Sequence, residues 1–413
     1  MSWETVKLGD VCEKIGSGAT PNGGATVYIE SGVSLIRSQN VYNLNFDYNG
    51  LVHINNEAAA KLNSVTVKEN DVLLNITGDS VARTCIVPSS MLPARVNQHV
   101  AIVRPNKDIL DPFFLNYYLA SPFMQSYMLG LAVGKGASRN AMTKEMIEKF
   151  EVPCPSLPIQ KTIVEKLKAY DDLIENNRRQ IKLLEEAAQR LYKEWFVDMH
   201  FPGWENTPIT DGVPEGWKTS DLSEIFDYVR GKSYTTGELS DTEGVVMVNL
   251  KNIQAFGGYS RNNEKRFVGK YKEEQCLSHG DVIMGVTDMT KERRLVGHVA
   301  MVPEFGEKAI MSMDLIKLVP KAIPSLFLYA VMHLGGYSYK ISPLANGTNV
   351  LHLKPETMMN LEMLIPDSSL IQRFEGIYRP IVEKIEKLQI QCDLAAEARD
   401  RLLPKLMSGE IEL

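Results

Sequence analysis

Residues 157–198, LPIQKTIVEKLKAYDDLIENNRRQIKLLEEAAQRLYKEWFVD, carry the clearest structural signal in the sequence. Apolar side chains recur in it at alternating steps of four and three residues, which is the a and d pattern of a coiled coil. The residues of this stripe, here called the first seam, are Ile163, Leu167, Tyr170, Ile174, Asn177, Ile181, Leu184, Ala188, Leu191 and Trp195. Because so narrow an apolar stripe must be buried against another helix, we expect a partner helix.

A second seam with the same spacing lies near the end of the sequence. Its members follow those of the first seam at a constant distance of 211 residues: Phe374, Tyr378, Ile381, Ile385, Leu388, Cys392, Ala395, Arg399, Leu402 and Leu406. We expect the two helices to pair antiparallel as a rigid spacer about 60 Å long, at about 1.5 Å per residue. An ordinary helix bundle is the alternative, and Asn177 either fixes the register or is a tolerated edge residue.

The segments that precede the two seams also resemble each other. WETVKLGDV (residues 3–11) matches WKTSDLSEI (217–225), and NDVLLNITGD (70–79) matches GDVIMGVTDM (280–289). Short runs such as VSLIRSQNV and DVIMGV alternate as strands do and are separated by turn residues. We therefore predict an α+β chain with a pseudo-twofold internal repeat, in which two β-rich domains are joined by two long antiparallel coiled-coil helices.

The repeat also sets the expected domain boundaries. We expect a first β-rich domain, its helix, a linker, a second β-rich domain and its helix, at residues 1–155, 156–200, 201–216, 217–366 and 367–413. The linker is predicted because proline, glycine and asparagine recur there and the hydrophobic periodicity stops. Trp204 and Trp217 are expected to dock it against the rest of the protein.

The composition suits a globular protein of the cytoplasm. The chain is 44% hydrophobic and 23% charged, and no apolar run reaches the roughly 18 residues that a membrane span needs. The charged start does not resemble a signal peptide, and five scattered cysteines without a C-x-x-C pair favour a reducing compartment. The net charge of −6 is unusual for a nucleic-acid binder, although a global sum leaves room for local basic loops.

The sequence contains no recognisable catalytic motif. GKS at residues 231–233 lacks the P-loop glycine five positions earlier, where Phe226 stands. The seven histidines lack the spacing of metal ligands, and we interpret Asp288, Lys291 and Glu292 as a solvated loop rather than a nuclease site. We therefore expect a non-catalytic chain that binds neither a metal nor a cofactor.

Polar clusters in the β-rich domains have the chemistry of base recognition, in which Arg or Lys reads guanine and Asn or Gln reads adenine. In the first domain the candidates are Arg37, Gln39, Asn40, Thr77, Asp79, Arg83, Asn97, Gln98, His99, Lys135, Ser138 and Arg139. In the second they are Lys232, Tyr234, Asn249, Lys251, Asn252, Lys291, Arg293, Arg294, Asn346, Thr348 and Asn349. The clusters fall at matching points of the repeat but differ in identity, as two scaffolds that read different half-sites would. The alternative is that these loops are polar because they face water.

Several of these segments resemble a known family. Residues 157–198 resemble the central conserved region of type I restriction–modification specificity subunits, and RLLPKLMSGEIEL (401–413) resembles that family's C-terminal conserved region. IRSQNV (36–41) and NQHVAIVRP (97–105) are similar to parts of its target-recognition domains. The second domain departs from the pattern, because MSMDLIKLVP (311–320) stands in place of the last motif.

The resemblance implies a DNA-recognition subunit. Each β-rich domain would be a target-recognition domain that binds one half of a split, asymmetric sequence in double-stranded DNA. The helices would fix the unread gap and dock two methyltransferase subunits, which would methylate adenine with S-adenosylmethionine. A restriction subunit that uses ATP and Mg²⁺ would complete the complex, and none of these cofactors is expected on this chain. The alternatives are a coiled-coil interaction scaffold without DNA specificity and an enzyme in its own right.

Overall fold

The computed structural model of the chain describes residues 3–133 and 141–411. The chain divides into two compact units, which consist of residues 1–177 with 391–413 and of residues 178–390. We call these the first unit and the second unit. Each unit contains a β-rich region and one stretch of each long helix.

Two sheets build the β-rich region of the first unit. A five-stranded sheet has the order β3 (Tyr28–Ile29), β7 (Val52–Ile54), β4 (Val33–Ile36), β11 (Ala94–Val96) and β8 (Thr66–Val67). A four-stranded sheet has the order β10 (Thr84–Ile86), β9 (Val72–Asn75), β12 (Val100–Pro105) and β2 (Cys12–Ser17). Strands β4 and β11 run parallel, and the other neighbours run antiparallel.

The second unit repeats both sheets in the same order. Its five-stranded sheet consists of β18 (Leu239–Ser240), β20 (Lys265–Phe267), β19 (Val245–Val248), β25 (Ala309–Met311) and β21 (Cys276–Leu277). Its four-stranded sheet consists of β24 (Val299–Met301), β22 (Val282–Gly285), β26 (Leu315–Pro320) and β17 (Phe226–Arg230). The parallel pair is again the third and fourth strand, β19 and β25. The predicted internal repeat is therefore confirmed strand by strand.

In each unit the four-stranded sheet lies between two cores, because successive side chains of a strand point to opposite faces. In β9, Leu73 faces the five-stranded sheet, whereas Val72 and Leu74 face the helical side. Strand β22 divides its side chains in the same way. Helices α3 (Pro112–Ala120) and α8 (Ser325–His333) cover the helical side of the two four-stranded sheets.

Shorter elements complete each unit. The first unit adds α1 (Leu8–Val11), α2 (Asn56–Lys61), α4 (Pro122–Ala132), α5 (Lys144–Glu148) and the strand pairs β1 (Thr5–Lys7) with β13 (Glu151–Pro153) and β5 (Val41–Tyr42) with β6 (Asn45–Phe46). The second unit adds α7 (Leu222–Ile225), α9 (Tyr337–Ile341) and the pairs β16 (Lys218–Asp221) with β28 (Glu362–Ile365), β14 (Ile209–Thr210) with β15 (Val213–Pro214) and β23 (Thr287–Asp288) with β27 (Leu351–His352). In the pairs β1–β13 and β16–β28, the first strand of each β-rich region pairs with its last strand, and a long helix follows directly after that last strand.

Both heptad segments form long helices. They are α6 (Leu157–Tyr192), which is extended by a π-helical turn at Lys193–Val197, and α10 (Ser368–Met407). Every side chain of the two predicted seams is buried or half-buried, so the a and d pattern identified the inward face of each helix. Among the described residues, no helix is both long and apolar enough to cross a membrane.

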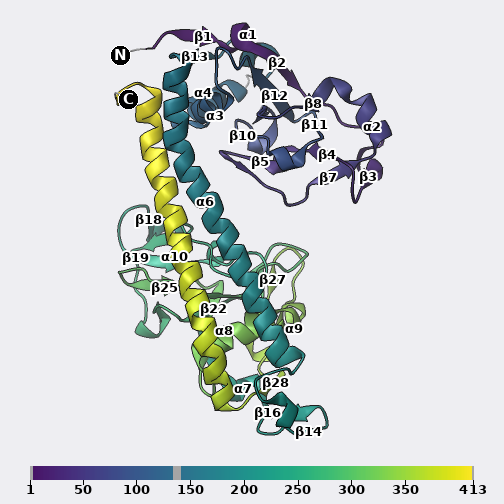
Figure 1. Ribbon diagram of the computed structural model, residues 1–413. Coiled ribbons are helices and arrows are strands. Elements are labelled where there is room, and N and C mark those ends of the chain that lie inside the picture. Colours follow the sequence, from purple (N-terminus) through teal and green to yellow (C-terminus); the bar gives the residue numbers. More distant parts are fainter. Residues whose placement is uncertain (1–2, 134–140, 412–413) are drawn as a thin grey trace. The chain divides into compact units, whose positions relative to one another are not determined.

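In the first unit, the beginning of α6 lies beside the end of α10 (Figure 1). Arg399 forms an ion pair with Asp171, and six residues farther along α6 the side chain of Asn177 donates a hydrogen bond to Gln391 at 3.3 Å. The two stretches therefore run in opposite directions. Because Asn177 is only 2% exposed and has a polar partner, it is a buried member of the seam rather than an edge residue.

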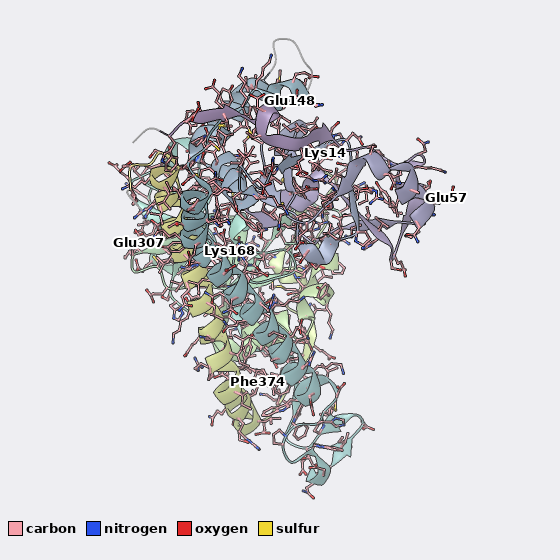
Figure 2. All side chains as sticks on the ribbon, turned by 45° about the horizontal axis from the view of Figure 1, so that its top comes forward. Lys14, Glu57, Glu148, Lys168, Glu307 and Phe374 are labelled. Carbon is pink, nitrogen blue, oxygen red and sulfur yellow. The ribbon has the colours of Figure 1, made fainter. Side chains whose placement is uncertain are left out.

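In the second unit, the end of α6 lies beside the beginning of α10. The rings of Tyr192 and Trp195 each lie 6.0 Å from the ring of Phe374, measured between centroids, and Figure 2 marks Phe374 on α10. Burial raises the pKa of the Tyr378 phenol. The nearby charge of Glu185, which precedes Tyr192 on α6, raises this pKa further, so Glu185 lies close to Tyr378. These stretches also run in opposite directions.

The predicted linker, residues 201–216, is folded rather than extended, since it contains the β14–β15 hairpin. Trp217 is buried, and its ring lies 5.4 Å from that of Phe201. Trp204 lies 4.7 Å from the ring of His200 but remains 40% exposed. The expected docking is therefore confirmed fully for Trp217 and only in part for Trp204.

Candidate nucleic-acid interface

In the first unit, four separate parts of the sequence meet around one hollow. They are the connections after β4, between β9 and β10, and between β11 and β12, and the segment at Ala141 before α5. The hollow has a volume of about 530 Å³ and is lined by Ser38, Gln39, Tyr42, Thr77, Gly78, Asp79, Ser80, Arg83, His99 and Ala141. The fold thus brings together five of the residues predicted to contact DNA, namely Gln39, Thr77, Asp79, Arg83 and His99.

Arg83 is held over an aromatic ring at this hollow. Its guanidinium carbon lies 4.5 Å from the ring centre of Tyr42, which is 39% exposed. The backbone positions Arg83, because its carbonyl accepts a hydrogen bond from Asn75 and the preceding residue, Ala82, has a φ of 74°. Stacking on Tyr42 leaves the N–H edge of the guanidinium available for a phosphate or a base. Tyr42 is not among the predicted residues, because nothing in the sequence indicates that it meets Arg83.

Thr77 and His99 form a hydrogen-bonded pair in the wall of the hollow. The hydroxyl oxygen Oγ1 of Thr77 lies 2.6 Å from Nδ1 of His99, and Nε2 of Gln98 lies 3.2 Å from Nε2 of the same ring. Gln98 itself is exposed. Polar groups of three predicted residues are therefore connected, and the threonine faces a space that a nucleic-acid base could enter.

Two other predicted residues of the first unit, Arg37 and Gln39, bind the same backbone carbonyl. Nη2 of Arg37 donates to the oxygen of Gly50 at 2.6 Å, and Nε2 of Gln39 lies 3.3 Å from it. Arg37 also lies 5.7 Å from the ring centre of Tyr28. Both side chains thus fasten the loop at Gly50, and only Gln39 also reaches the hollow.

Four of the predicted asparagines are buried and support loops instead: Asn40, Asn97, Asn249 and Asn252. The side chain of Asn40 donates to the carbonyl oxygen of Asp47 and accepts from the N–H of Arg37. Asn252 holds the matching turn of the second unit, where it donates to Ser260 and accepts from the N–H of Asn249. The amides of Asn40, Asn249 and Asn252 are thus used within the protein, and the structure gives them a supporting role rather than the predicted role of reading bases.

In the second unit, a buried aspartate organises the loop that carries most of the predicted cations. One carboxylate oxygen of Asp288 accepts from the N–H of Thr290 at 2.7 Å, and the other from the N–H of Leu295 at 2.6 Å. Burial raises the pKa of Asp288, but these hydrogen bonds outweigh it and hold that pKa below its usual value. The interpretation of Asp288 as part of a solvated loop is therefore wrong. The loop that it closes presents Lys291 and Arg294 to solvent.

The remaining candidates of the second unit gather from two other places. Strand β27 pairs with β23, and this brings the exposed segment that contains Asn346, Thr348 and Asn349 next to the Asp288 loop. Arg293 of that loop has a φ of 51° and is half-buried. The exposed Lys251 lies on the turn after β19.

Tyr234 has a structural contact that the sequence analysis did not anticipate. The ammonium group of Lys265 lies 2.8 Å from its hydroxyl oxygen and 5.1 Å from its ring centre. The ring also packs against the small core that contains Phe267. Tyr234 is therefore held within the protein.

The glycine of the GKS segment has a steric role in this fold. A Cβ on Gly231 would lie 1.9 Å from the carbonyl oxygen of Ser312, and a Cβ on Gly18, at the matching place in the first unit, 2.0 Å from that of Val96. Because they have no Cβ, Gly18 directly after β2 and Gly231 directly after β17 let the chain pass close to the backbone of Val96 and Ser312, respectively. The approach also places Lys232 in a backbone bridge with Ser312.

A threonine–aspartate pair in the second unit occupies the place of Thr77 and His99. Oγ1 of Thr287 donates to Oδ1 of Asp314 at 3.0 Å. Asp314 is half-buried and precedes β26, as His99 precedes β12. Asp314 is not among the predicted residues, because its segment lacks the Asn–Gln–His of the first unit.

Three predicted residues, Lys135, Ser138 and Arg139, lie outside the described residues. A larger cavity of about 690 Å³ lies in the second unit, but its walls come from α6, α8, α10 and nearby loops and contain none of the residues predicted to contact DNA. In the described part of the chain, no group of three His, Cys, Asp or Glu side chains is placed to hold a metal ion.

Comparisons with known proteins show which family the chain resembles over its whole length. A family model described as the type I restriction modification DNA specificity domain matches residues 1–186 and 214–375. The specificity subunit of the type I restriction enzyme MjaIX of Methanocaldococcus jannaschii is 24% identical over 419 residues, which cover 100% of this chain and 94% of that protein. The HindI specificity subunit of Haemophilus influenzae is 20% identical and covers 84% of this chain and 87% of its own length.

A solved structure has the same fold. The crystal structure of the type I restriction–modification S subunit from M. genitalium superimposes with a TM-score of 0.60 over 98% of this chain and 96% of that chain, at 13% identity.

Proposed function

Since the chain belongs to the type I restriction modification DNA specificity family, we propose that its two β-rich regions each read one half of a split DNA sequence. The chain is a specificity subunit of a type I restriction–modification system. The single observation that carries the proposal is the gathering of Gln39, Thr77, Arg83 and His99 around one hollow. These side chains supply the donors and acceptors that base edges and phosphates require.

The two regions would read different sequences because their strands match while their loops do not. The first unit offers Arg83 stacked on Tyr42, whereas the second offers the Asp288 loop with Lys291 and Arg294. The half-buried Arg83 in the first unit and the exposed Lys291 and Arg294 in the second would let a chain with a net charge of −6 meet phosphates locally. An asymmetric, bipartite target follows from two scaffolds with different side chains.

The long helices would act as a spacer between the two half-sites. Antiparallel contacts within each unit support one continuous coiled coil made by α6 and α10. We infer that this coiled coil sets the unread gap and that its outward faces dock two methyltransferase subunits. The chain itself would be non-catalytic, and restriction subunits would join the same complex.

The proposal is tested by mapping adenine methylation in cells that express the partner methyltransferase with and without this chain. A bipartite, asymmetric motif should appear only when the chain is present. If an active, bound methyltransferase gives no new motif, the chain is an interaction scaffold without DNA specificity.

Two variants test the assignment of roles to the parts. Replacing residues 217–366 by the equivalent region of a relative should change one half-site and leave the other unchanged. Adding one matched heptad to each of α6 and α10 should lengthen the gap and leave both half-sites unchanged. A change in both half-sites after the first replacement, or an unchanged gap after the insertion, would contradict the respective role.

A further inference from the structure

The two units place a threonine at the same point of the repeat and give it partners of opposite chemistry. Thr77 follows β9, and Thr287 follows β22. Each threonine contacts the side chain of the residue that directly precedes a long neighbouring strand. This residue is His99, before β12, in the first unit and Asp314, before β26, in the second. The shared position makes the difference between the partners informative.

In the first unit, the partner leaves the threonine with a proton to donate. The amide nitrogen of Gln98 lies 3.2 Å from Nε2 of His99 and is a donor, so this ring nitrogen accepts. The neutral ring then carries its proton on Nδ1, which donates to Oγ1 of Thr77 over 2.6 Å. The hydroxyl proton of Thr77 is therefore free to point into the hollow that this residue lines.

In the second unit, the hydroxyl proton of the threonine is already used in a hydrogen bond to its partner. A carboxylate can only accept, so the hydroxyl of Thr287 must donate to Oδ1 of Asp314 over 3.0 Å. The other oxygen of Asp314, Oδ2, has no hydrogen-bond donor among the residues that the structure describes. Because Asp314 is only half-buried, this oxygen remains accessible to a ligand.

A purely structural role does not account for Asp314. Asp288 of the same unit shows what a structural carboxylate looks like here, since it is fully buried and both of its oxygens accept backbone N–H groups. Asp314 is more exposed and uses one oxygen. Nor is it suited to a phosphate, because two negative charges in contact repel each other.

We propose that this position is a matched pair of specificity determinants with inverted polarity. The first unit presents a donor, the hydroxyl of Thr77, to a base that offers an acceptor in the major groove, such as guanine O6 or N7. The second unit presents an acceptor, Oδ2 of Asp314, to an exocyclic amino group, which is N4 of cytosine or N6 of adenine. The inference rests on the proposed function, because it assigns base chemistry to regions that bind DNA.

The experiment compares methylation motifs of the assembled complex carrying Thr77→Val or Asp314→Asn with the motif of the wild type. Thr77→Val keeps the shape and removes the donor, and Asp314→Asn keeps the shape and replaces the free acceptor. We expect each variant to relax one base of one half-site by roughly tenfold, and the two variants to affect different half-sites. Asp241→Asn, which removes an exposed charge of the second unit, is the matched control and should leave the motif unchanged.

Each outcome separates this inference from the proposed function. If both variants methylate the wild-type motif with wild-type preference, the inference is wrong while the proposed function stands. If the wild type itself produces no motif, the proposed function is wrong. Uniform loss of methylation by a variant whose melting temperature matches the wild type would also overturn the inference, because it would mean a contact without base preference.

A duplex that lacks one amino group gives a second, independent readout. At the base relaxed by Asp314→Asn, the exocyclic amino group is removed by placing purine for adenine or 2-pyrimidinone for cytosine. The wild-type complex should bind this duplex about tenfold more weakly than the normal one, whereas Asp314→Asn should bind both equally. Equal loss in the wild type and the variant would show that Asp314 does not face that group.

Discussion

The connection between β9 and β10 in the first unit and the connection between β22 and β24 in the second join equivalent strands in different ways. Residues 76–83 form a short turn with Gly78 at its start, whereas residues 286–298 form a longer loop with the buried Asp288 at the same point. The strands on either side keep the same order and register. The loops of this scaffold therefore differ in length and sequence while the strand order of its sheets stays the same, as a recognition domain requires.

The largest expected loss of stability concerns the close backbone approach at a glycine that both units share. Gly18→Ala and Gly231→Ala should each lower the free energy of unfolding by about 4 kcal/mol, because the new methyl group would meet a backbone oxygen at about 2 Å. Denaturant unfolding of the purified chain measures both. Gly16→Ala and Gly237→Ala are the controls, since a Cβ at either position has no neighbour within 4 Å. A small effect at one of the first pair would show that the shared crossing matters in one unit only.

A smaller effect on the free energy of unfolding should distinguish the two units at Asp71 and Asp281, which occupy equivalent positions of the repeat. Asp71 is fully buried and binds Arg104 at 2.7 Å, whereas Asp281 is 28% exposed and lies 3.5 Å from Lys317. Asp71→Asn should cost about 3 kcal/mol because it leaves Arg104, whose side chain is only 12% exposed, without its charge partner, and Asp281→Asn less than about 1 kcal/mol. Chemical unfolding of the two variants side by side tests this ranking. Equal losses would mean that burial does not separate the two pairs.

The elements of this fold could be predicted from sequence because their signals are local. The heptad spacing of residues 157–198 and the alternation in LIKLVP, which is strand β26, depend on neighbours a few positions away. The internal repeat added a second copy of each signal. For these reasons the helices, the strands and their duplication are confirmed.

The site could be predicted only in part, because its geometry depends on residues far apart in the sequence. Nothing near Arg83 indicates that Tyr42 will stack on it. Asn40 has the residue type of a base reader, yet the turn that contains it closes around its amide. Asp288 looked solvated because no local pattern shows that the N–H of Leu295 folds back onto it.

The anchored loop of the second unit predicts a dependence on pH that the first unit lacks at this point. The folded-state pKa of Asp288 is depressed, so its contribution to stability is complete above its pKa in the unfolded chain and is lost as pH falls through the folded pKa. Asp288→Asn should cost about 2 kcal/mol at neutral pH and less in acid, because it weakens the hydrogen bonds to several buried N–H groups. Unfolding curves between pH 7 and acid measure the difference, with Asp241→Asn as the control. A loss that is constant over this range would contradict the role of the charge.

The smallest expected effect on stability separates function from folding. Arg83→Met removes the cation–π contact between a half-buried arginine and the exposed Tyr42, and Lys61→Met removes an exposed ion pair with Glu57 on α2, so each should cost about 0.5 kcal/mol. The stability of the two variants should therefore be the same within error, while only Arg83→Met should weaken or alter methylation at one half-site. The readouts are the melting temperature of the chain and the methylation motif of the complex. If Lys61→Met changes the motif as much as Arg83→Met does, the hollow around Arg83 is not where the first unit meets DNA, and the contrast between the two connections would reflect loop stability alone.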